Sequence, residues 1–196
     1  QICVKKLMQE GYAYPDFTTA EELDAIRAKQ EAAKVDIGYY GEYAVGRNLT
    51  YEQIEEKLAA GEPYVVRLKS PGKTVVYSDP IRGKIEMPEN MMDVVLLKSD
   101  GIPTYHFAHA VDDHFMRTNM VIRGDEWLAS YPLHKQLFEL CGFELPEYAH
   151  ISPIMKMEIS VDEDGNEHQH KRKLSKRKDP EAAVGFYQEQ GYPSES

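Results

Sequence analysis

The residues most able to do chemistry gather in a basic run near the end of the chain. Six positive charges lie within residues 171–178: Lys171, Arg172, Lys173, Lys176, Arg177 and Lys178. The chain as a whole is acidic, with a net charge of -10, which excludes a generally basic DNA-coating protein. Such a local basic cluster is typical of a site for a polyphosphate or a nucleic-acid backbone. A solvated loop or a targeting signal has the same charge pattern, so charge alone does not separate these interpretations.

The spacing within the run favours a phosphate site. Its centre, KLSKR at residues 173–177, follows a polar insert at 160–170 and precedes a helix predicted over 179–191. Two lysines three residues apart on a mobile loop can close over a triphosphate and stabilise the charge that develops as pyrophosphate leaves. The chain contains no glycine-rich P-loop and no GxGxxG, so a nucleotide would be held by another device.

A second polar cluster falls on one face of a predicted helix. Tyr105, Ala108, His109 and Asp112 follow the spacing i, i+3, i+4 and i+7, which aligns them on one side of the helix. This mixture indicates the polar wall of a pocket rather than a core stripe. The Asp-Asp-His string at 112–114 also suggests a metal site, but adjacent aspartates on a helix point apart and no HxxxH or HExxH pair is present. We therefore expect no metal ligands.

The third cluster follows a short apolar strand predicted at 120–122. Arg123 stands at the carboxyl end of this strand, where open α/β sheets place ligand contacts. A guanidinium can hold a carboxylate with two hydrogen bonds, so Arg123 is a candidate for binding an acidic substrate. The structural alternative is an ion pair of Arg123 with Asp112 or Glu126. Trp127, the single tryptophan, can stack on a ligand or pack in the core.

The elements that must position these residues change in character near residue 93. Downstream, three apolar strands alternate with two helices: strands at 94–97, 120–122 and 149–155, helices at 103–116 and 130–142. This alternation is typical of a parallel sheet in an α/β protein.

Upstream of residue 93, the patterns predict small α+β structure. Capping boxes begin two helices, at Thr19–Glu22 and Thr50–Gln53. Strands at 64–68 and 74–77, with Ser-Pro-Gly between them, predict a β-hairpin, and residues 85–87 predict a further strand.

Length and composition set the outer limits. The 196 residues, 42% of them hydrophobic, suit a globular protein of one large or two small domains. No apolar stretch approaches the roughly 20 residues of a membrane helix. Cys3 and Cys141 are too few for a disulfide framework or a cysteine-rich zinc site, so we expect a reduced, cytoplasmic protein. The chain opens within a predicted helix and without Met; we expect an excised piece of a longer protein, although a removed leader would give the same start.

Together, these clusters resemble those of bacterial glutamyl-tRNA synthetases, which are class I aminoacyl-tRNA ligases. The matching segments, in the family's order, are GIPTYHFA (101–108), VDDH (111–114), VIRG (121–124), EWL (126–128), AHI (149–151) and KLSKR (173–177). The spacing agrees except for a longer insert before KLSKR. Upstream, residues 11–15, 19–34, 47–49 and 66–68 resemble the family's connective insertion, so the resemblance covers essentially the whole chain.

The resemblance implies a Rossmann-type α/β catalytic domain that is split by an insertion contacting the tRNA acceptor stem. The chain would comprise the insertion (1–92), the second half of the Rossmann-type domain (93–170), and the KLSKR loop with the start of a stem-contacting domain (171–196). The parent would make glutamyl-adenylate from glutamate and ATP with Mg²⁺ and transfer glutamate to the 3′ end of tRNA(Glu). We expect this parent to be monomeric and to have no membrane partner.

The resemblance also implies a role for each site residue. Tyr105 and Arg123 match residues that hold glutamate, and His109 falls at a polar pocket position that is often Asn. The strip that contacts ATP corresponds to Glu126, Trp127, Ile154 and Met155. Lys173 and Lys176 match mobile-loop lysines that stabilise the activation transition state. Some members carry a Cys-x-Cys zinc site after a Tyr-Pro, but residues 16–18 here are Asp-Phe-Thr, so we expect no zinc.

Two alternatives stay open at the level of sequence. One is a tRNA-modifying paralogue that glutamylates a modified base, and the other is a non-catalytic tRNA- or partner-binding domain. The second predicts loss of ATP contacts, yet Lys173, Lys176 and Trp127 are present. The family's HIGH motif has no counterpart, because the chain contains no His-x-Gly-His; we therefore expect the chain alone to be inactive. These motifs do not distinguish a parent that charges only tRNA(Glu) from one that also charges tRNA(Gln).

Overall fold

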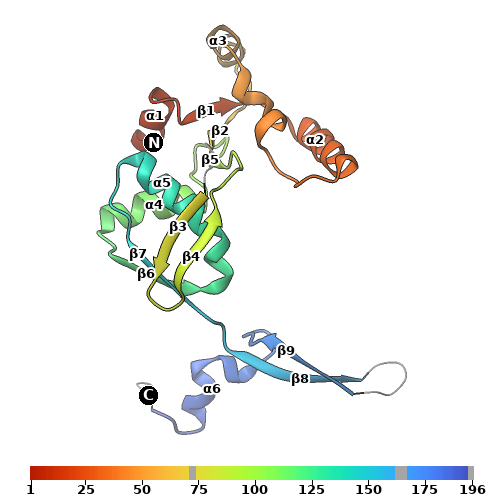
Figure 1. The fold of residues 1–196 in the computed structure, drawn as a ribbon, viewed down its shortest axis with the longest axis vertical. Helices are drawn as coiled ribbons and strands as arrows, with labels where there is room; N and C mark the ends of the chain where they lie inside the picture. Colours follow the sequence, from red (N-terminus) through yellow and green to blue (C-terminus); the bar gives the residue numbers. More distant parts are fainter. Residues whose placement is uncertain (71–73, 162–166, 194–196) are drawn as a thin grey trace.

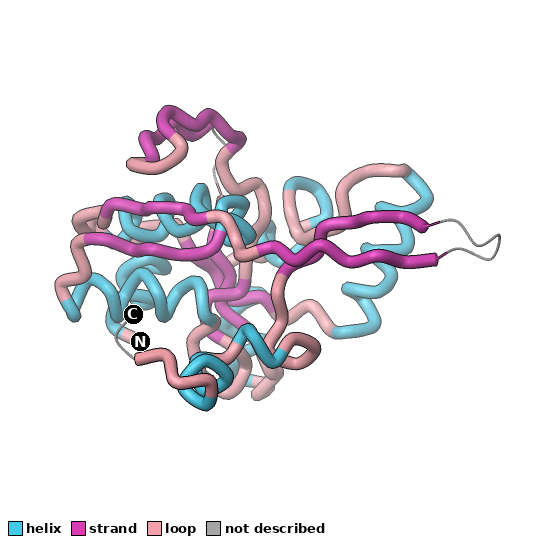
Figure 2. Tube along the Cα trace, turned by 90° about the horizontal axis from the view of Figure 1, so that it is seen from below, coloured by secondary structure: helices cyan, strands magenta, loops and turns pink. Residues whose placement is uncertain are grey.

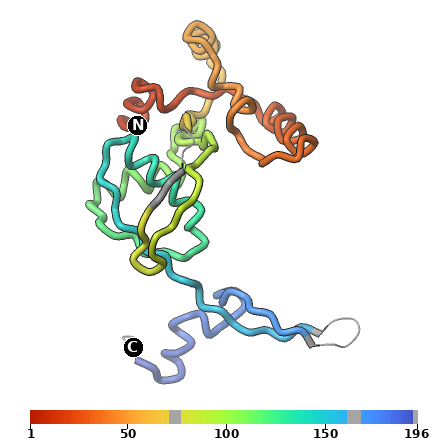
Figure 3. Tube along the Cα trace, in the orientation of Figure 1, coloured from red at the N-terminus to blue at the C-terminus, as the bar shows by residue number. Residues whose placement is uncertain are grey.

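The computed structural model describes residues 1–70, 74–161 and 167–193. Figure 1 shows a central body with an extension at each end. The upper extension carries α2 (Ala20–Ala33) and α3 (Tyr51–Ala59); the lower one carries a β-hairpin and α6 (Val184–Glu189). The trace in Figure 3 places the first residue on the body and the last described residues beyond the hairpin. Within the described ranges, no helix is long and apolar enough to cross a membrane.

A three-stranded antiparallel sheet lies at the upper end of the body. Its central strand is β2 (Val65–Leu68), flanked by β1 (Ala13–Asp16) and β5 (Val95–Leu97). The predicted hairpin between 64–68 and 74–77 is therefore wrong. Instead β3 (Thr74–Asp79) pairs with β4 (Gly83–Pro88), across a short local turn, whereas β2 finds both partners far away in the sequence. Strand propensity does not specify such distant pairing. The expected turn at Pro71 and Gly72 lies outside the described residues.

The expected parallel pairing is present between two strands. β6 (Met120–Gly124) runs parallel to β7 (Glu147–Ile151), with α5 (Tyr131–Cys141) connecting them. The expectation for 94–97 is correct only for the strand itself, because β5 pairs antiparallel with β2. An apolar run indicates burial on both faces but not strand direction.

The predicted strand at 149–155 is in fact two strands. Residues 152–154 separate β7 from β8 (Met155–Val161), which pairs antiparallel with β9 (Glu167–Lys173). Figure 2 shows this hairpin reaching away from the body. Its strands include residues 160–161 and 167–170 of the polar insert, whereas 162–166 lie outside the described residues. The helix expected over 179–191 is a short 3-10 turn, Pro180–Ala182, followed by α6.

The main core packs the antiparallel sheet against three helices, namely α1 (Ile2–Gln9), α4 (Tyr105–Met116) and α5. Leu7, Leu96 and Leu137 are fully buried there, together with Ala110 of α4. Each buried leucine contributes about 1.5–3 kcal/mol of hydrophobic stabilisation. This packing fixes α4 and α5, which carry or border the predicted pocket.

A second, aromatic cluster docks the β3–β4 hairpin onto the parallel strands. Tyr77 of β3 stacks on Tyr131 of α5 at a centroid distance of 3.6 Å. Tyr131 in turn meets Tyr148 of β7 edge-on at 5.1 Å. All three rings are buried, so the hairpin is anchored beside the carboxyl ends of β6 and β7.

The first part of the chain is held by helix caps and buried ion pairs. Both predicted capping boxes are confirmed, with Thr19 and Thr50 accepting from the backbone of Glu22 and Gln53. Arg67 of β2 donates to Asp16 of β1 at 2.5 Å, and both side chains are buried. Asp16, one of the three residues at 16–18 on which the expectation of no zinc rests, is thus a structural carboxylate in this chain.

Candidate functional site

Arg123 is held at the carboxyl end of β6 by two histidines. Its Nε donates to Nε2 of His150 at 3.0 Å, and its Nη1 lies 2.8 Å from Nδ1 of His134. The guanidinium carbon stands 4.6 Å from the ring centroid of Tyr148. The second terminal nitrogen, Nη2, is buried and has no hydrogen-bond partner among the described residues. Because unpaired buried donors are costly, this nitrogen is a strong candidate for an anionic ligand contact.

The alternative ion pairs of Arg123 are absent from the described part of the chain. Neither Asp112 nor Glu126 contacts its guanidinium; Asp112 is exposed, and Glu126 pairs with Lys173. The prediction that Asp112 shares the pocket wall is therefore wrong. Asp113 takes that place, because its Oδ2 lies 2.9 Å from Nδ1 of His109 on the next turn of α4.

His109 contacts Tyr148, which also supports Arg123, and Tyr105 packs on His109. Nε2 of His109 lies 2.9 Å from the Tyr148 hydroxyl, so the ring that supports Arg123 also anchors His109. Burial lowers the pKa of His109, although Asp113 opposes this shift. Tyr105 is 55% exposed and stacks loosely on His109, with centroids 5.9 Å apart. Arg123 and the pair Tyr105 and His109, which come from two separate motifs, therefore lie in one side-chain cluster.

Most of the residues predicted to bind ATP border a second hollow, beyond the carboxyl ends of β6 and β7. A hollow of about 300 Å³ separates the carboxyl ends of β6 and β7 from the KLSKR loop. Its lining includes four of the predicted residues, namely Glu126, Ile154, Lys173 and Lys176. Trp127 lies outside this lining and meets Tyr105 at a centroid distance of 5.0 Å. Met155 is also outside it, at the start of β8 opposite Lys173.

The basic run is divided between two roles. Arg172 binds the buried Asp179 with two hydrogen bonds, of 2.6 and 2.7 Å. Ser175 donates its backbone N–H to the same carboxylate at 2.9 Å. These contacts, Arg172 first, hold the pKa of Asp179 well below its usual range. The Asp179 side chain therefore holds the loop, and it makes no cap hydrogen bond to the 3-10 turn that follows it.

The two lysines of the loop differ in their surroundings. Lys173 pairs with Glu126 at 2.5 Å, and this hydrogen bond lowers the pKa of Glu126. Lys176 is exposed and makes no ion pair with the described residues. Both residues line the hollow, but the Lys173 ammonium is already paired with Glu126 whereas Lys176 has no ion pair among the described residues.

The sequence analysis missed several residues of the site. His134 is fully buried on α5, and burial lowers its pKa to about 2, helped by His109, Arg123 and His106. A histidine on the otherwise apolar face of helix 130–142 was a usable signal. His150 belongs to the AHI segment (149–151), but the resemblance implies no role for it. Asp79 is the last residue of β3, and no motif in its sequence neighbourhood indicates a functional role.

Comparison with known proteins decides the family. The model of the catalytic domain of class I tRNA synthetases (E and Q) matches residues 1–196. This chain belongs to that family. Two synthetases of known structure have a similar fold, each with a TM-score of 0.73. The glutamate tRNA ligase from Elizabethkingia meningosepticum, solved with its amino acid, is 40% identical, with 90% of this chain and 35% of that one covered. The glutamate-tRNA synthetase from Elizabethkingia anophelis is 38% identical, and the match covers 98% of this chain and 37% of that one.

Curated synthetases are more similar in sequence. The glutamate–tRNA ligase of Clostridium perfringens strain 13 is 56% identical over 196 residues, covering 98% of this chain and 34% of the relative. The glutamate–tRNA ligase of Clostridium beijerinckii is 57% identical over 192 residues, covering 96% of this chain and 33% of the relative. The chain therefore spans about a third of the length of the synthetases it matches.

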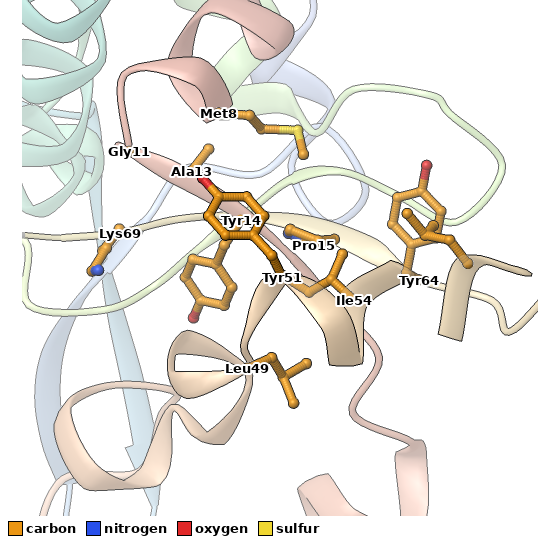
Figure 4. Close-up of a pocket in the computed structure, with 11 residues that line it drawn as sticks. Met8, Gly11, Ala13, Tyr14, Pro15, Leu49, Tyr51, Ile54, Tyr64 and Lys69 are labelled. Carbon is orange, nitrogen blue, oxygen red and sulfur yellow. The ribbon is translucent and has the colours of Figure 1, made fainter. Parts of the chain in front are cut away.

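The chain also has an apolar hollow whose lining does not include Arg123. It measures about 320 Å³ and lies between β1 and α3. Figure 4 shows Tyr14, Pro15 and Tyr51 around it, with Lys69 at one side. None of the predicted site residues lines it.

In the described ranges of this chain, no group of three or more His, Cys, Asp or Glu is placed to hold a metal ion.

Proposed function

We propose that the chain forms part of the glutamate-activating site of a glutamate–tRNA ligase. The observation that carries this proposal is the buried, unpartnered Nη2 of Arg123. A carboxylate of glutamate would satisfy this donor with a charge-assisted hydrogen bond. Glutamine, nearly identical in shape, would leave the guanidinium without a counter-charge, and this difference favours glutamate.

Tyr105 and His109 complete the amino-acid side of the proposed pocket. Asp113 accepts from Nδ1 of His109, so the neutral ring accepts a hydrogen bond from the Tyr148 hydroxyl at Nε2. His109 thus serves to fix Tyr148 under the guanidinium. Tyr105, exposed and close to Trp127, offers an aromatic wall to the substrate.

ATP, as its Mg²⁺ complex, would enter the hollow lined by Glu126 and Ile154. Trp127 and Met155, each next in sequence to one of these residues, would contact ATP from outside that lining. A carboxylate oxygen of glutamate attacks the α-phosphorus, the bond from that phosphorus to the bridging oxygen breaks, and pyrophosphate leaves. Lys173 and Lys176 border the same hollow, where their charges would stabilise the negative charge that grows on the phosphates.

The division of labour along the chain is also part of the proposal. Residues 1–92 would contact the acceptor stem of tRNA(Glu), 93–170 would form the second half of the Rossmann-type domain, and 171–196 would carry the activating loop. The similar curated proteins are named glutamate–tRNA ligase, which does not favour the tRNA-modifying or non-catalytic alternatives. The cytoplasmic location and monomeric state of the parent stay predictions.

Amino-acid-dependent pyrophosphate exchange tests this function. The full-length protein that contains this chain should exchange labelled pyrophosphate into ATP with glutamate and tRNA(Glu) present. Glutamine and aspartate should support little exchange. Exchange driven equally by glutamine, or transfer of glutamate to a base of tRNA instead of its 3′ end, would contradict the proposal.

A further inference from the structure

A string of hydrogen bonds passes through Arg123 and reaches the β3–β4 hairpin. On one side, Arg123 donates to Nε2 of His150, whose Nδ1 lies 2.7 Å from Oδ2 of Asp79. On the other side, Nη1 of Arg123 meets His134, whose Nε2 lies 2.9 Å from Nδ1 of His106. Asp79, His150 and His134 are buried, so water does not substitute freely for these partners.

The donor character of arginine fixes the direction of every bond in the string. A guanidinium only donates hydrogen bonds, so His150 must accept at Nε2 and His134 at Nδ1. The proton of His150 is then on Nδ1 and is donated to Asp79. A proton on Nε2 of His150 would face the N–H of Arg123 and break the contact.

Asp79 is built to hold this arrangement in place. Its Oδ1 accepts from the backbone N–H groups of Ile81 and Arg82, at 2.8 and 2.9 Å. Its Oδ2 accepts from the backbone N–H and Nδ1 of His150, at 3.0 and 2.7 Å. Burial by itself raises the pKa of Asp79, but these hydrogen bonds, led by that from Arg82, lower it to about 2. The carboxylate is therefore a permanent acceptor aimed at one ring nitrogen.

We propose that Asp79 and His150 are positioning residues that orient Arg123 for glutamate. Neither residue contacts the substrate. Asp79 fixes the tautomer of His150, His150 fixes Nε of Arg123, and the guanidinium is left with Nη2 as its free donor. The β3–β4 hairpin thereby contributes to amino-acid selection although it lies in the segment assigned to tRNA contact. The substrate part of this inference rests on the proposed function.

Asp79→Asn is the sharpest perturbation, because asparagine offers one acceptor oxygen where Asp79 uses two. If the amide NH₂ takes the place of Oδ1, the backbone N–H groups of Ile81 and Arg82 lose their acceptor. If the NH₂ takes the place of Oδ2, it donates to Nδ1 of His150 and forces the ring proton onto Nε2. In the full-length enzyme, the KM for glutamate should rise about tenfold to a hundredfold, as when an orienting partner behind a ligand is removed. The KM for ATP should stay within about twofold, since the hollow is untouched.

Asp125→Asn is the matched control. Asp125 accepts from Nη2 of Arg82 at 2.8 Å and so anchors the same hairpin without touching the string. This variant should leave the KM for glutamate within about twofold.

At His150, glutamine keeps an acceptor for Arg123 while leucine does not, so His150→Gln should retain clearly tighter glutamate binding than His150→Leu.

Long-range ¹H–¹⁵N spectra of the histidine rings give a readout that does not depend on activity. In the full-length protein, His150 should be neutral with its proton on Nδ1, and Asp79→Asn should change that signal. A proton on Nε2 of wild-type His150 would overturn the inference. So would an Asp79→Asn variant that loses thermal stability while its KM for glutamate equals that of Asp125→Asn. Lack of glutamate-dependent exchange in the wild type would instead refute the proposed function, and the spectra would still test the string.

Discussion

Arg123 and His150 stand opposite each other in the parallel ladder of β6 and β7, with Nε of Arg123 donating to Nε2 of His150 across 3.0 Å. Both residues lie near the carboxyl ends of their strands, where an α/β sheet exposes side chains to a ligand. The guanidinium is thus oriented by the sheet itself, while α4 and the KLSKR loop supply the surfaces on either side.

Lys176→Ala in the full-length enzyme should slow glutamate activation far more than it weakens glutamate binding. Its charge faces phosphates whose negative charge grows only as pyrophosphate leaves, so the stabilisation is specific to the transition state. We expect a loss of about 10²–10³-fold in single-turnover activation, comparable to the removal of one oxyanion donor.

Lys178→Ala is the control for this loop, because Lys178 is exposed and does not line the hollow. Lys178→Ala should change the single-turnover rate of glutamate activation little. If Lys176→Ala also lowers that rate by less than about tenfold, the basic run is a solvated or tRNA-contacting surface and not part of the activating site.

Local signals in the sequence predicted local structure well. The capping boxes at Thr19 and Thr50 act within one helical turn, and both are present. Arg123 and His109 are candidates because their residue types are unusual at a strand end and on a helix face, and the structure brings both against Tyr148. Such signals depend on neighbours in the sequence, which can be read directly.

Distant relationships were not predictable in the same way. The partner of β2 is chosen by packing of segments far apart in the chain, so the hairpin expected at 64–77 was wrong. Asp79 enters the site only because aromatic stacking of Tyr77 on Tyr131 docks its hairpin there. Asp113, and not Asp112 of the predicted helix face, contacts His109, because side-chain direction as well as face decides which carboxylate reaches the ring.

The chain by itself should form no glutamyl-adenylate. It contains no His-x-Gly-His, and an electrostatic site divided between two parts loses its preorganisation. Glutamate-dependent pyrophosphate exchange should therefore be at background for residues 1–196 and restored in the full-length protein. Exchange by the isolated chain at a rate near that of the full-length enzyme would show that these residues suffice.

The chain should also bind no stoichiometric zinc. Asp16 is committed to Arg67, and Thr18 donates its hydroxyl to Asp16 at 2.5 Å, so the position used for zinc in some relatives is occupied by a structural network. Elemental analysis after dialysis should give far less than one zinc per chain. One retained zinc per chain would refute this, and Asp16→Asn would then test whether this carboxylate holds it.

The central claim, that Arg123 binds a carboxylate of glutamate, is tested most directly by Arg123→Gln in the full-length enzyme. Arg117→Gln, an exposed arginine at the end of α4, is the control for loss of one positive charge. The account predicts that Arg123→Gln raises the KM for glutamate by about a hundredfold, or ~2.7 kcal/mol. The KM for ATP should stay within about threefold, and the preference for glutamate over glutamine should narrow. A variant that loses thermal stability while its KM for glutamate stays close to that of Arg117→Gln would contradict the account and leave Arg123 as a structural residue.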